Sequence, residues 1–164
     1  MCKFMYWLKK NVGKIPMTEI SVADYLTDLR SQQEGFLDLS FETIAGYAEH
    51  GAIVHYAATE ETDVPLKPEG FLLVDSGGHY LEGTTDTTRT FAMGPLTDEQ
   101  KQMYTAVLRG NLNLSHARFL KGCSGYNLDV ICRTPLWQIG MDYKHGTGHG
   151  VGCYLNDHEG PTNF

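Results

Sequence analysis

The sequence predicts an α+β fold in which helices pack on a mostly antiparallel sheet. Capping-box patterns that precede apolar residues at helical spacing predict the helices. Short alternating or apolar runs, separated by turns that contain glycine, predict the strands. With 164 residues, the chain is long enough for one domain with a substantial core.

Two helices are predicted near the N-terminus. The first covers about Lys3 to Lys10, and the second runs from a capping box at Ser21-Val22-Ala23-Asp24 to about Glu34. The second helix has one apolar face, formed by Val22, Tyr25, Leu26 and Leu29. We expect this face to pack against the sheet.

Strands are predicted between Phe36 and Met93. Two come first: an alternating run at Phe41, Thr43, Ala45 and Tyr47, and an apolar run at Ala52-Ile53-Val54-His55-Tyr56 after a His-Gly turn. Phe71 to Asp75 is predicted to be a buried strand. Ser76-Gly77-Gly78 is then expected to reverse the chain, and Thr85 to Met93 to form a further strand.

Two more helices are predicted before the chain returns to extended structure. A second capping box, Thr97-Asp98-Glu99-Gln100, begins a helix that we expect to end near Lys121-Gly122. A shorter helix runs from about Asn127 to Ile139, with Pro135 as a weak point. From His145 onward the chain is predicted to be extended.

Composition narrows the kind of protein. The net charge of −7 argues against nucleic acid or an anionic membrane surface as the main partner. No apolar run approaches the ~20 residues that span a membrane, and the N-terminal apolar patch is not a signal peptide. The four cysteines form no Cys-x-x-Cys pair, so we expect free thiols in a reducing compartment. The sequence therefore predicts a cytoplasmic protein.

Two aspartates on neighbouring apolar segments are the first candidate site residues. Asp75 ends an apolar strand, where a carboxylate is costly unless a positive or hydrogen-bonding group meets it. A hairpin can bring Asp86 back beside Asp75, and a divalent cation would remove the repulsion between the two carboxylates. The simpler interpretation is one turn-capping aspartate and one solvated aspartate, and these two residues alone leave both open.

Three histidines lie in a segment rich in glycine: His145 and His149 in His145-Gly146-Thr147-Gly148-His149, and His158 nine residues later. Glycine permits close backbone approaches that a side chain would block, so this pattern indicates a built site. The same glycines disfavour the helix on which paired histidines usually bind zinc. Taken alone, His145 and His149 are at least as compatible with structural roles as with metal binding, and for His55 and His158 a structural role is the favoured interpretation.

Together, these segments resemble the metallopeptidases of the pita-bread (creatinase/aminopeptidase) fold, and specifically the Xaa-Pro aminopeptidases. The resemblance extends over essentially the whole chain. It is carried by Ile53-Val54-His55-Tyr56, Val74-Asp75-Ser76-Gly77-Gly78, Glu82 to Thr90, His145 to Gly152, and His158-Glu159-Gly160-Pro161. It implies a metallopeptidase catalytic domain over residues 1–164 with a curved, mostly antiparallel sheet.

The resemblance implies a metal centre of two divalent ions, most suitably Mn²⁺. Asp75 would bind one ion, Asp86 would bridge both, and His149 would bind the other; a carboxylate-rich site with one imidazole suits manganese. The implied reaction removes the N-terminal residue from peptides with proline second, through attack by a hydroxide held by both ions.

Three further histidines receive roles from the same resemblance. His55 would hydrogen-bond the developing oxyanion or position the substrate. His158 would shuttle a proton near the proline nitrogen, a role that suits an imidazole because its pKa lies near the working pH. His145 would line the pocket that receives proline.

The same residues separate some relatives from others. His145 and the long interval from His149 to His158 favour proline-directed members over methionine aminopeptidases. Creatinase-like members would be expected to replace metal ligands, whereas Asp75, Asp86 and His149 are all present. Xaa-Pro dipeptidases (prolidases) use much the same residues and stay an alternative.

The family pattern is incomplete within these residues. The family's metal centre has five protein ligands, and two of them are glutamates on strands that would follow Phe164. Glu159 occupies the position after the shuttle histidine, so it is not a candidate ligand. Xaa-Pro aminopeptidases also usually have further domains before the catalytic one. We therefore expect a domain truncated at both ends, with a sheet edge and part of a core face left open.

Two expectations follow from this incompleteness. The 164-residue chain alone should bind metal weakly and have little or no peptidase activity. The competing hypothesis is a non-catalytic pita-bread module that binds peptides or proteins. Self-association into a homo-oligomer is compatible with either.

Overall fold

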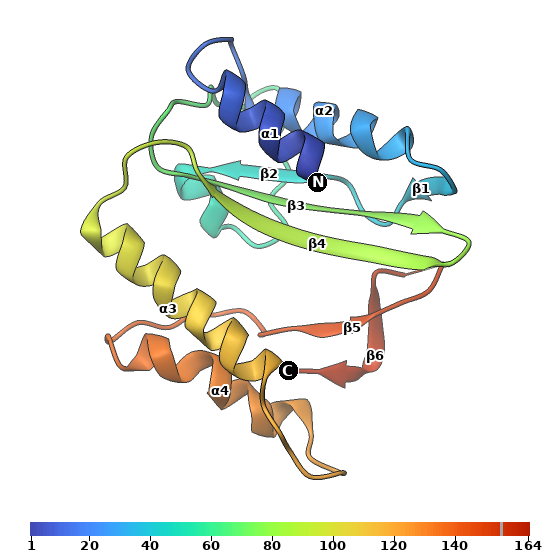
Figure 1. Ribbon diagram of the computed structural model, residues 1–164, viewed down its shortest axis with the longest axis vertical. Coiled ribbons are helices and arrows are strands. Elements are labelled where there is room, and N and C mark those ends of the chain that lie inside the picture. The colour runs from blue at the N-terminus through green and yellow to red at the C-terminus, as the bar shows by residue number, and fades with distance from the viewer. Residues whose placement is uncertain (155) are drawn as a thin grey trace. The chain divides into compact units, whose positions relative to one another are not determined.

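The computed structural model describes residues 1–154 and 156–164. The chain divides into two compact units, drawn in Figure 1: the first comprises Met1–Pro95 with Val151–Asp157, and the second comprises Leu96–Gly150 with His158–Phe164. Helices combined with antiparallel sheet confirm the predicted α+β fold. That residues 1–164 are one incomplete catalytic domain stays a prediction.

An antiparallel sheet of four strands forms the centre of the first unit. Its strands are β1 (Phe36–Leu39), β2 (Ile44–Tyr47), β3 (Phe71–Tyr80) and β4 (Gly83–Ala92). The long strand β3 pairs with β4 along one edge and, along the other, with β2 and then β1 (Figure 1). Every other strand of this sheet is thus fixed by its pairing with β3.

Helices α1 (Cys2–Asn11) and α2 (Glu19–Ser31) cover one face of this sheet (Figure 1). The core between them is formed by large apolar side chains, among them Phe4, Leu8, Val22, Leu26, Leu72, Val74 and Phe91. Full burial of one such side chain contributes roughly 1.5–3 kcal/mol. Alternate residues of β3 are buried in this core, which leaves the intervening ones on the opposite sheet face.

The predicted N-terminal helices are confirmed, but the capping box of α2 lies three residues earlier than predicted. Thr18 is the N-cap: its hydroxyl accepts from the Ser21 N–H at 3.2 Å, and the Ser21 hydroxyl accepts from the Thr18 N–H at 2.8 Å. Ser21 therefore serves as the third helical residue rather than as the cap. Asp63 accepts a further hydrogen bond from the Ile20 N–H at 3.1 Å.

The predicted strand at Ala52-Ile53-Val54-His55-Tyr56 is wrong. The chain forms a 3₁₀ helix, η1 (Ala48–Ala52), followed by a turn in which the Tyr56 N–H donates to the Ile53 carbonyl at 3.2 Å. A strand needs a pairing partner, and the β3 residues nearby, Leu72 to Asp75, already pair with β2. The apolar run instead forms local hydrogen bonds.

The predicted reversal at Ser76-Gly77-Gly78 is also wrong, because β3 continues through it to Tyr80. The hairpin turns at the two residues between Tyr80 and Gly83. A Cβ on Gly77 would lie 2.0 Å from the Thr85 carbonyl oxygen and 2.1 Å from the Ser40 hydroxyl. This glycine therefore permits a close backbone approach within the sheet rather than a turn.

Two helices build the second unit. α3 (Asp98–Ser115) begins at the predicted capping box, where the Thr97 hydroxyl accepts from the Gln100 N–H. It ends at Ser115, earlier than predicted, and the His116 ring caps the Leu112 carbonyl at 2.8 Å. α4 (Gly125–Trp137) continues through Pro135. The two helices touch where Gly110 meets Cys132, whose thiol donates to the Gly110 carbonyl at 3.4 Å.

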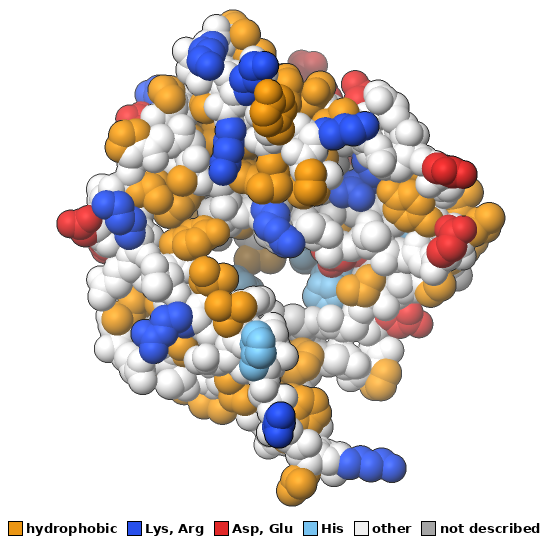
Figure 2. Space-filling view, viewed as in Figure 1, with side chains coloured by type: hydrophobic (Ala, Val, Ile, Leu, Met, Phe, Trp, Pro, Cys, Tyr) orange, Lys and Arg blue, Asp and Glu red, His pale blue; other side chains and the backbone are white. Residues whose placement is uncertain are grey.

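The chain is extended again after His145, as predicted, and forms the paired strands β5 (His149–Val151) and β6 (His158–Asn163). No helix in the described part of the chain has the length and apolar character that a membrane crossing requires. On the face drawn in Figure 2, Lys and Arg side chains are interspersed with acidic and apolar ones rather than gathered in one basic patch.

Candidate metal centre

The hairpin of β3 and β4 places Asp75 and Asp86 on one face of the sheet. Asp75 is opposite Thr88, and Asp86 is opposite Gly77, so the two aspartates are diagonal neighbours across the strand pair. The buried pair Leu72 and Phe91 belongs to the other face, which packs against the helices. Alternation along both strands therefore directs both carboxylates away from the core of the first unit.

Both carboxylates are half-buried. The Thr88 hydroxyl donates to Asp75 Oδ1 at 2.7 Å, which fixes one oxygen of that carboxylate. Diagonal neighbours lie about 7–8 Å apart at their Cα atoms. Two like charges at this separation repel, and a divalent cation with oxygen ligands would relieve the repulsion. The hairpin thus presents two carboxylates of the kind that divalent ions bind.

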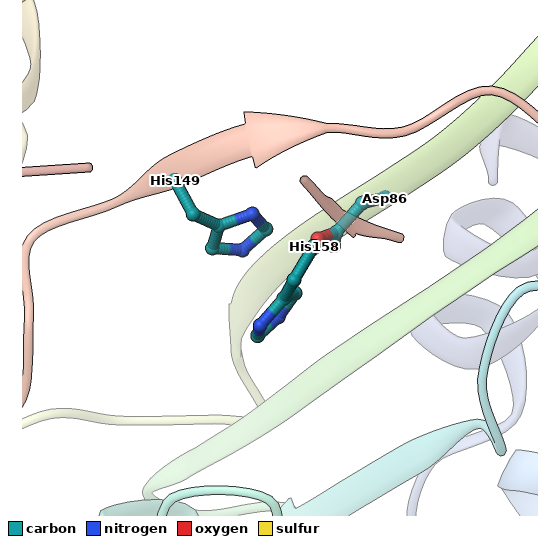
Figure 3. A group of neighbouring side chains, drawn as sticks. All are labelled: Asp86, His149 and His158. Atoms are coloured by element: carbon teal, nitrogen blue, oxygen red, sulfur yellow. The ribbon is translucent and has the colours of Figure 1, made fainter. Parts of the chain in front are cut away.

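In the second unit, strand pairing brings His149 and His158 together. The centroids of their rings are 3.7 Å apart, and Figure 3 shows both rings, together with Asp86 on β4. His149 Nδ1 lies 2.9 Å from the Gly150 carbonyl oxygen, which can only accept, so Nδ1 carries the proton. In a neutral ring the lone pair is then on Nε2, which is the arrangement found in metal-binding histidines.

His145 is exposed, and its ring stacks on that of Tyr143 with centroids 4.8 Å apart. Its Nδ1 donates to the Gly146 carbonyl at 2.7 Å. Arg133, on α4, donates to the backbone carbonyls of both Tyr143 and His145, at 2.7 and 2.9 Å. The guanidinium group also lies over the Tyr143 ring, 4.1 Å from its centroid. The backbone leading into the histidine segment is thus held from α4.

A second residue of α4 fixes the middle of that segment. Asp129 accepts a hydrogen bond from the Thr147 hydroxyl, and Arg133 Nε donates to its other oxygen at 2.7 Å. The Thr147 hydrogen bond, and then the one from Arg133, hold the pKa of Asp129 below its ordinary value. The hydrogen bond to Asp129 likewise raises the pKa of Arg133. Both charges are therefore retained throughout the neutral range.

His55 lies in the turn after η1, and its side chain is exposed. Its backbone has φ of 57°, in the left-handed region that residues other than glycine rarely adopt. Such a conformation persists only where the surrounding structure enforces it. The Tyr56 side chain next to it is buried.

The structure thus pairs four of the six predicted site residues: Asp75 with Asp86, and His149 with His158. His145 stacks on Tyr143, and His55 lies in the turn after η1. The ligand and catalytic roles of all six stay predictions.

Sequence reasoning missed the residues that hold these segments in place. For Asp129 and Arg133 a signal existed, because opposite charges four residues apart on a predicted helix form an ion pair. For Glu19, which is fully buried and bonded to the segment before His55, the sequence offers no such signal.

The comparisons with known proteins point to one family. The sequence profile of metallopeptidase family M24 matches residues 1–164. Aminopeptidase P1 of Arabidopsis thaliana is 48% identical over 153 residues, which cover 93% of this chain and 24% of that protein. The chain thus spans about a quarter of the length of such curated relatives.

Solved structures agree with this match. The X-prolyl aminopeptidase of Caenorhabditis elegans, described as a cytosolic enzyme with a di-nuclear active site, superposes with a TM-score of 0.94 at 42% identity. That superposition covers 98% of this chain and 26% of the other. The Xaa-Pro dipeptidase of Bacillus anthracis superposes with a TM-score of 0.81 at 28% identity, over 98% and 43% of the two chains. The pita-bread fold predicted from the sequence is therefore confirmed.

Proposed function

The chain belongs to metallopeptidase family M24, and we propose that it is the metal-binding part of an Xaa-Pro aminopeptidase. Such an enzyme removes the N-terminal residue from peptides whose second residue is proline. The observation that carries the proposal is the register of β3 and β4, with Asp75 and Asp86 on one sheet face. Similarity to proteins named aminopeptidase P and Xaa-Pro aminopeptidase P supports this choice within the family.

We propose that Asp75, Asp86 and His149 hold two divalent metal ions, with Asp86 shared between them. Two carboxylates and one imidazole fit Mn²⁺, and the Nδ1 hydrogen bond of His149 leaves Nε2 as the ligand atom. The chemistry that such ions supply is a water of lowered pKa and a Lewis acid for the scissile carbonyl. Two glutamates from sequence that follows Phe164 would complete the ligand set.

The remaining histidines of this chain would act on the substrate. We propose that His55 hydrogen-bonds the carbonyl oxygen as negative charge develops on it, or positions the peptide for attack. His158 would transfer a proton to the proline nitrogen as the peptide bond breaks. His145 would line the proline pocket, where the stacked Tyr143 ring gives it a fixed orientation.

The proposed cellular compartment is based on the same relatives. We propose cytoplasmic peptides as substrates, because the relative in Caenorhabditis elegans is described as cytosolic. Nucleic acid and membrane are not proposed as partners, and self-association stays open to measurement.

Two alternatives compete with this function. The first is an Xaa-Pro dipeptidase, which would cleave only dipeptides. The similarity of this chain to the Bacillus anthracis enzyme supports that alternative. A non-catalytic module would bind proline-containing peptides with or without metal and leave them intact. Substrate length separates the first alternative from the aminopeptidase, and metal dependence separates the second.

The test uses the protein expressed from its complete reading frame. Metal-free protein is mixed with a tripeptide and with a dipeptide that each have proline second, with and without Mn²⁺. We expect metal-dependent cleavage of the tripeptide, and a loss of at least about 10³-fold in Asp86→Ala, which removes a shared ligand. Asp24→Ala, at an exposed position of α2, is the matched control and should retain activity. Near-normal turnover in Asp86→Ala would contradict the metal role.

Calorimetry tests the metal site separately from activity. Titration of the 164-residue chain with Mn²⁺ should show weak binding, because three ligands leave the ions' charge incompletely balanced. The protein from the complete reading frame should bind more tightly. Two tightly bound ions on the 164-residue chain would exclude the need for further glutamates.

A further inference from the structure

Glu19 is a fully buried acidic residue that has no part in the proposed chemistry. Its exposed fraction is 0%, although it lies in the first turn of α2. An isolated buried carboxylate is strongly unfavourable, so its oxygens must be paired. The N-terminal end of a helix favours negative charge, but that effect is small beside the cost of desolvation.

Hydrogen bonds to one carboxylate compensate for this burial. The Tyr47 N–H donates to Oε1 at 2.6 Å, His50 Nδ1 lies 3.0 Å from both oxygens, and the Tyr56 hydroxyl donates to Oε2 at 3.1 Å. A carboxylate only accepts, so His50 Nδ1 carries its proton in this arrangement. The rings of His50 and Tyr56 also pack together, with centroids 4.5 Å apart.

All of these donors belong to one segment, residues 47–56, which contains η1 and His55. The segment has a positive φ at two non-glycine residues: 52° at Ala48 and 57° at His55. Each such conformation costs on the order of 1–3 kcal/mol and must be enforced by its surroundings. Ala48 directly follows Tyr47, and His55 directly precedes Tyr56. Glu19 thus binds the residue next to each strained position.

We propose that Glu19 is the positioning residue that fixes the backbone conformation of His55 through Tyr47, His50 and Tyr56. This inference rests on the proposed function for the task of His55 itself. The conformation of the segment, however, can be tested without any activity. Glu19 does not touch the substrate in this proposal, so its effect must pass through His55.

A double-mutant cycle tests that dependence in the protein from the complete reading frame. Tyr56→Phe removes one hydrogen bond to Glu19. Glu19→Gln keeps the side chain's shape but removes its charge and one of its two acceptor oxygens. We expect kcat/KM to fall about 5–10-fold in Tyr56→Phe and about 10–100-fold in Glu19→Gln, mainly through kcat. In a His55→Ala background, each change should cost less than about twofold, because its target is gone.

Tyr47→Phe is the matched control. It also deletes a hydroxyl from a buried tyrosine of the same unit, but that hydroxyl donates to the Glu69 carbonyl at 2.9 Å rather than to Glu19. Its effect on kcat should stay within about twofold in either background. Equal losses for Tyr56→Phe and Tyr47→Phe, or full additivity of Tyr56→Phe with His55→Ala, would overturn the proposal.

Hydrogen exchange provides the second readout, independent of catalysis. The Ile53 and Tyr56 amides donate to His50 and Ile53 within the segment, so they report its closed conformation. Tyr56→Phe should accelerate their exchange about tenfold, and Tyr47→Phe should not. Unchanged exchange in Tyr56→Phe and Glu19→Gln would refute the positioning role. If the wild-type protein cleaves no proline peptide, the proposed function fails, and exchange alone still decides the role of Glu19.

Discussion

Two anchors hold histidine-bearing segments in this molecule, and they differ in chemistry. In the first unit, the fully buried Glu19 carboxylate binds a backbone amide, a histidine and a tyrosine hydroxyl. In the second unit, Asp129 and Arg133 of α4 form an ion pair whose side chains are 23% and 15% exposed. The first anchor holds residues on both sides of His55, and the second fixes the backbone from Tyr143 to Thr147.

The difference shows that burial determines how much stability is lost when a charged group loses a hydrogen-bond partner. A buried carboxylate depends on each of its donors, because water cannot replace a lost one. A partly exposed ion pair can exchange some partners for water, and it responds to pH and salt. We therefore expect the Glu19 anchor to be costly to break and little affected by salt, because the carboxylate is shielded from solvent ions. The anchor on α4 should show the opposite behaviour.

The largest expected effect is that of Glu19→Ala. This change leaves the buried Tyr47 amide and the His50 ring without their acceptor. The Tyr56 hydroxyl keeps only its longer contacts to Thr62, at 3.3 and 3.5 Å. We expect the free energy of unfolding to fall by about 4 kcal/mol, as for other broken buried networks. Urea unfolding, followed by tryptophan fluorescence, measures it. A loss below about 1 kcal/mol would mean that water enters the cluster, which would remove the contrast between the two anchors.

Arg133→Ala should have a smaller effect on stability but a clear local one. It removes hydrogen bonds to Asp129, Asp142 and the carbonyls of Tyr143 and His145. We expect a loss of about 2 kcal/mol, because the partners are partly hydrated. Arg133→Lys should recover only part of it, since one ammonium cannot serve these directions together. Full recovery by lysine would show that charge, not the geometry of the guanidinium group, sustains the segment.

The smallest effect is the pH dependence of the Asp129 anchor. The hydrogen bond from Thr147 and then that from Arg133 lower the pKa of Asp129 from its ordinary 3.8. Because the folded-state pKa is depressed, the stabilisation is fully present above the unfolded pKa and is lost as pH falls through the folded value. The difference in stability between wild type and Asp129→Asn should thus be constant, at about 1–2 kcal/mol, above pH ~5. It should shrink below pH ~3.8. A difference that persists at lower pH would contradict the charged role of Asp129.

Local signals explain what the sequence could predict about the fold. The Thr97 capping box gives the start of α3 because both of its hydrogen bonds form between residues three apart. The apolar face of α2 is equally local. By contrast, Gly77 belongs to a strand because of what approaches it from Thr85 and Ser40, which no local pattern reveals. The same limit applies to Ile53 and Val54, whose turn follows from the pairing of β3 with another segment.

The candidate site shows the same division. Asp75 and Asp86 could be proposed together because their segments are expected to form a hairpin. The register that places them on one face could not, since the turn lies after Tyr80 and not at the predicted glycines. The importance of Glu19 could not, because it depends on contacts with residues 28 to 37 positions away. Asp129 and Arg133 lie between these cases: their mutual pairing is local, but their hold on Thr147 and His145 is not.

The length of the two-residue turn between Tyr80 and Gly83 determines which face of the sheet Asp86 occupies. If one residue were inserted there and the tight turn retained, every later residue of β4 would shift by one pairing position. Asp86 would then face Ser76, on the side that packs against the helices, instead of sharing a face with Asp75. A single inserted codon could therefore remove a candidate metal ligand without changing any side chain, whereas an insertion of two would restore the parity.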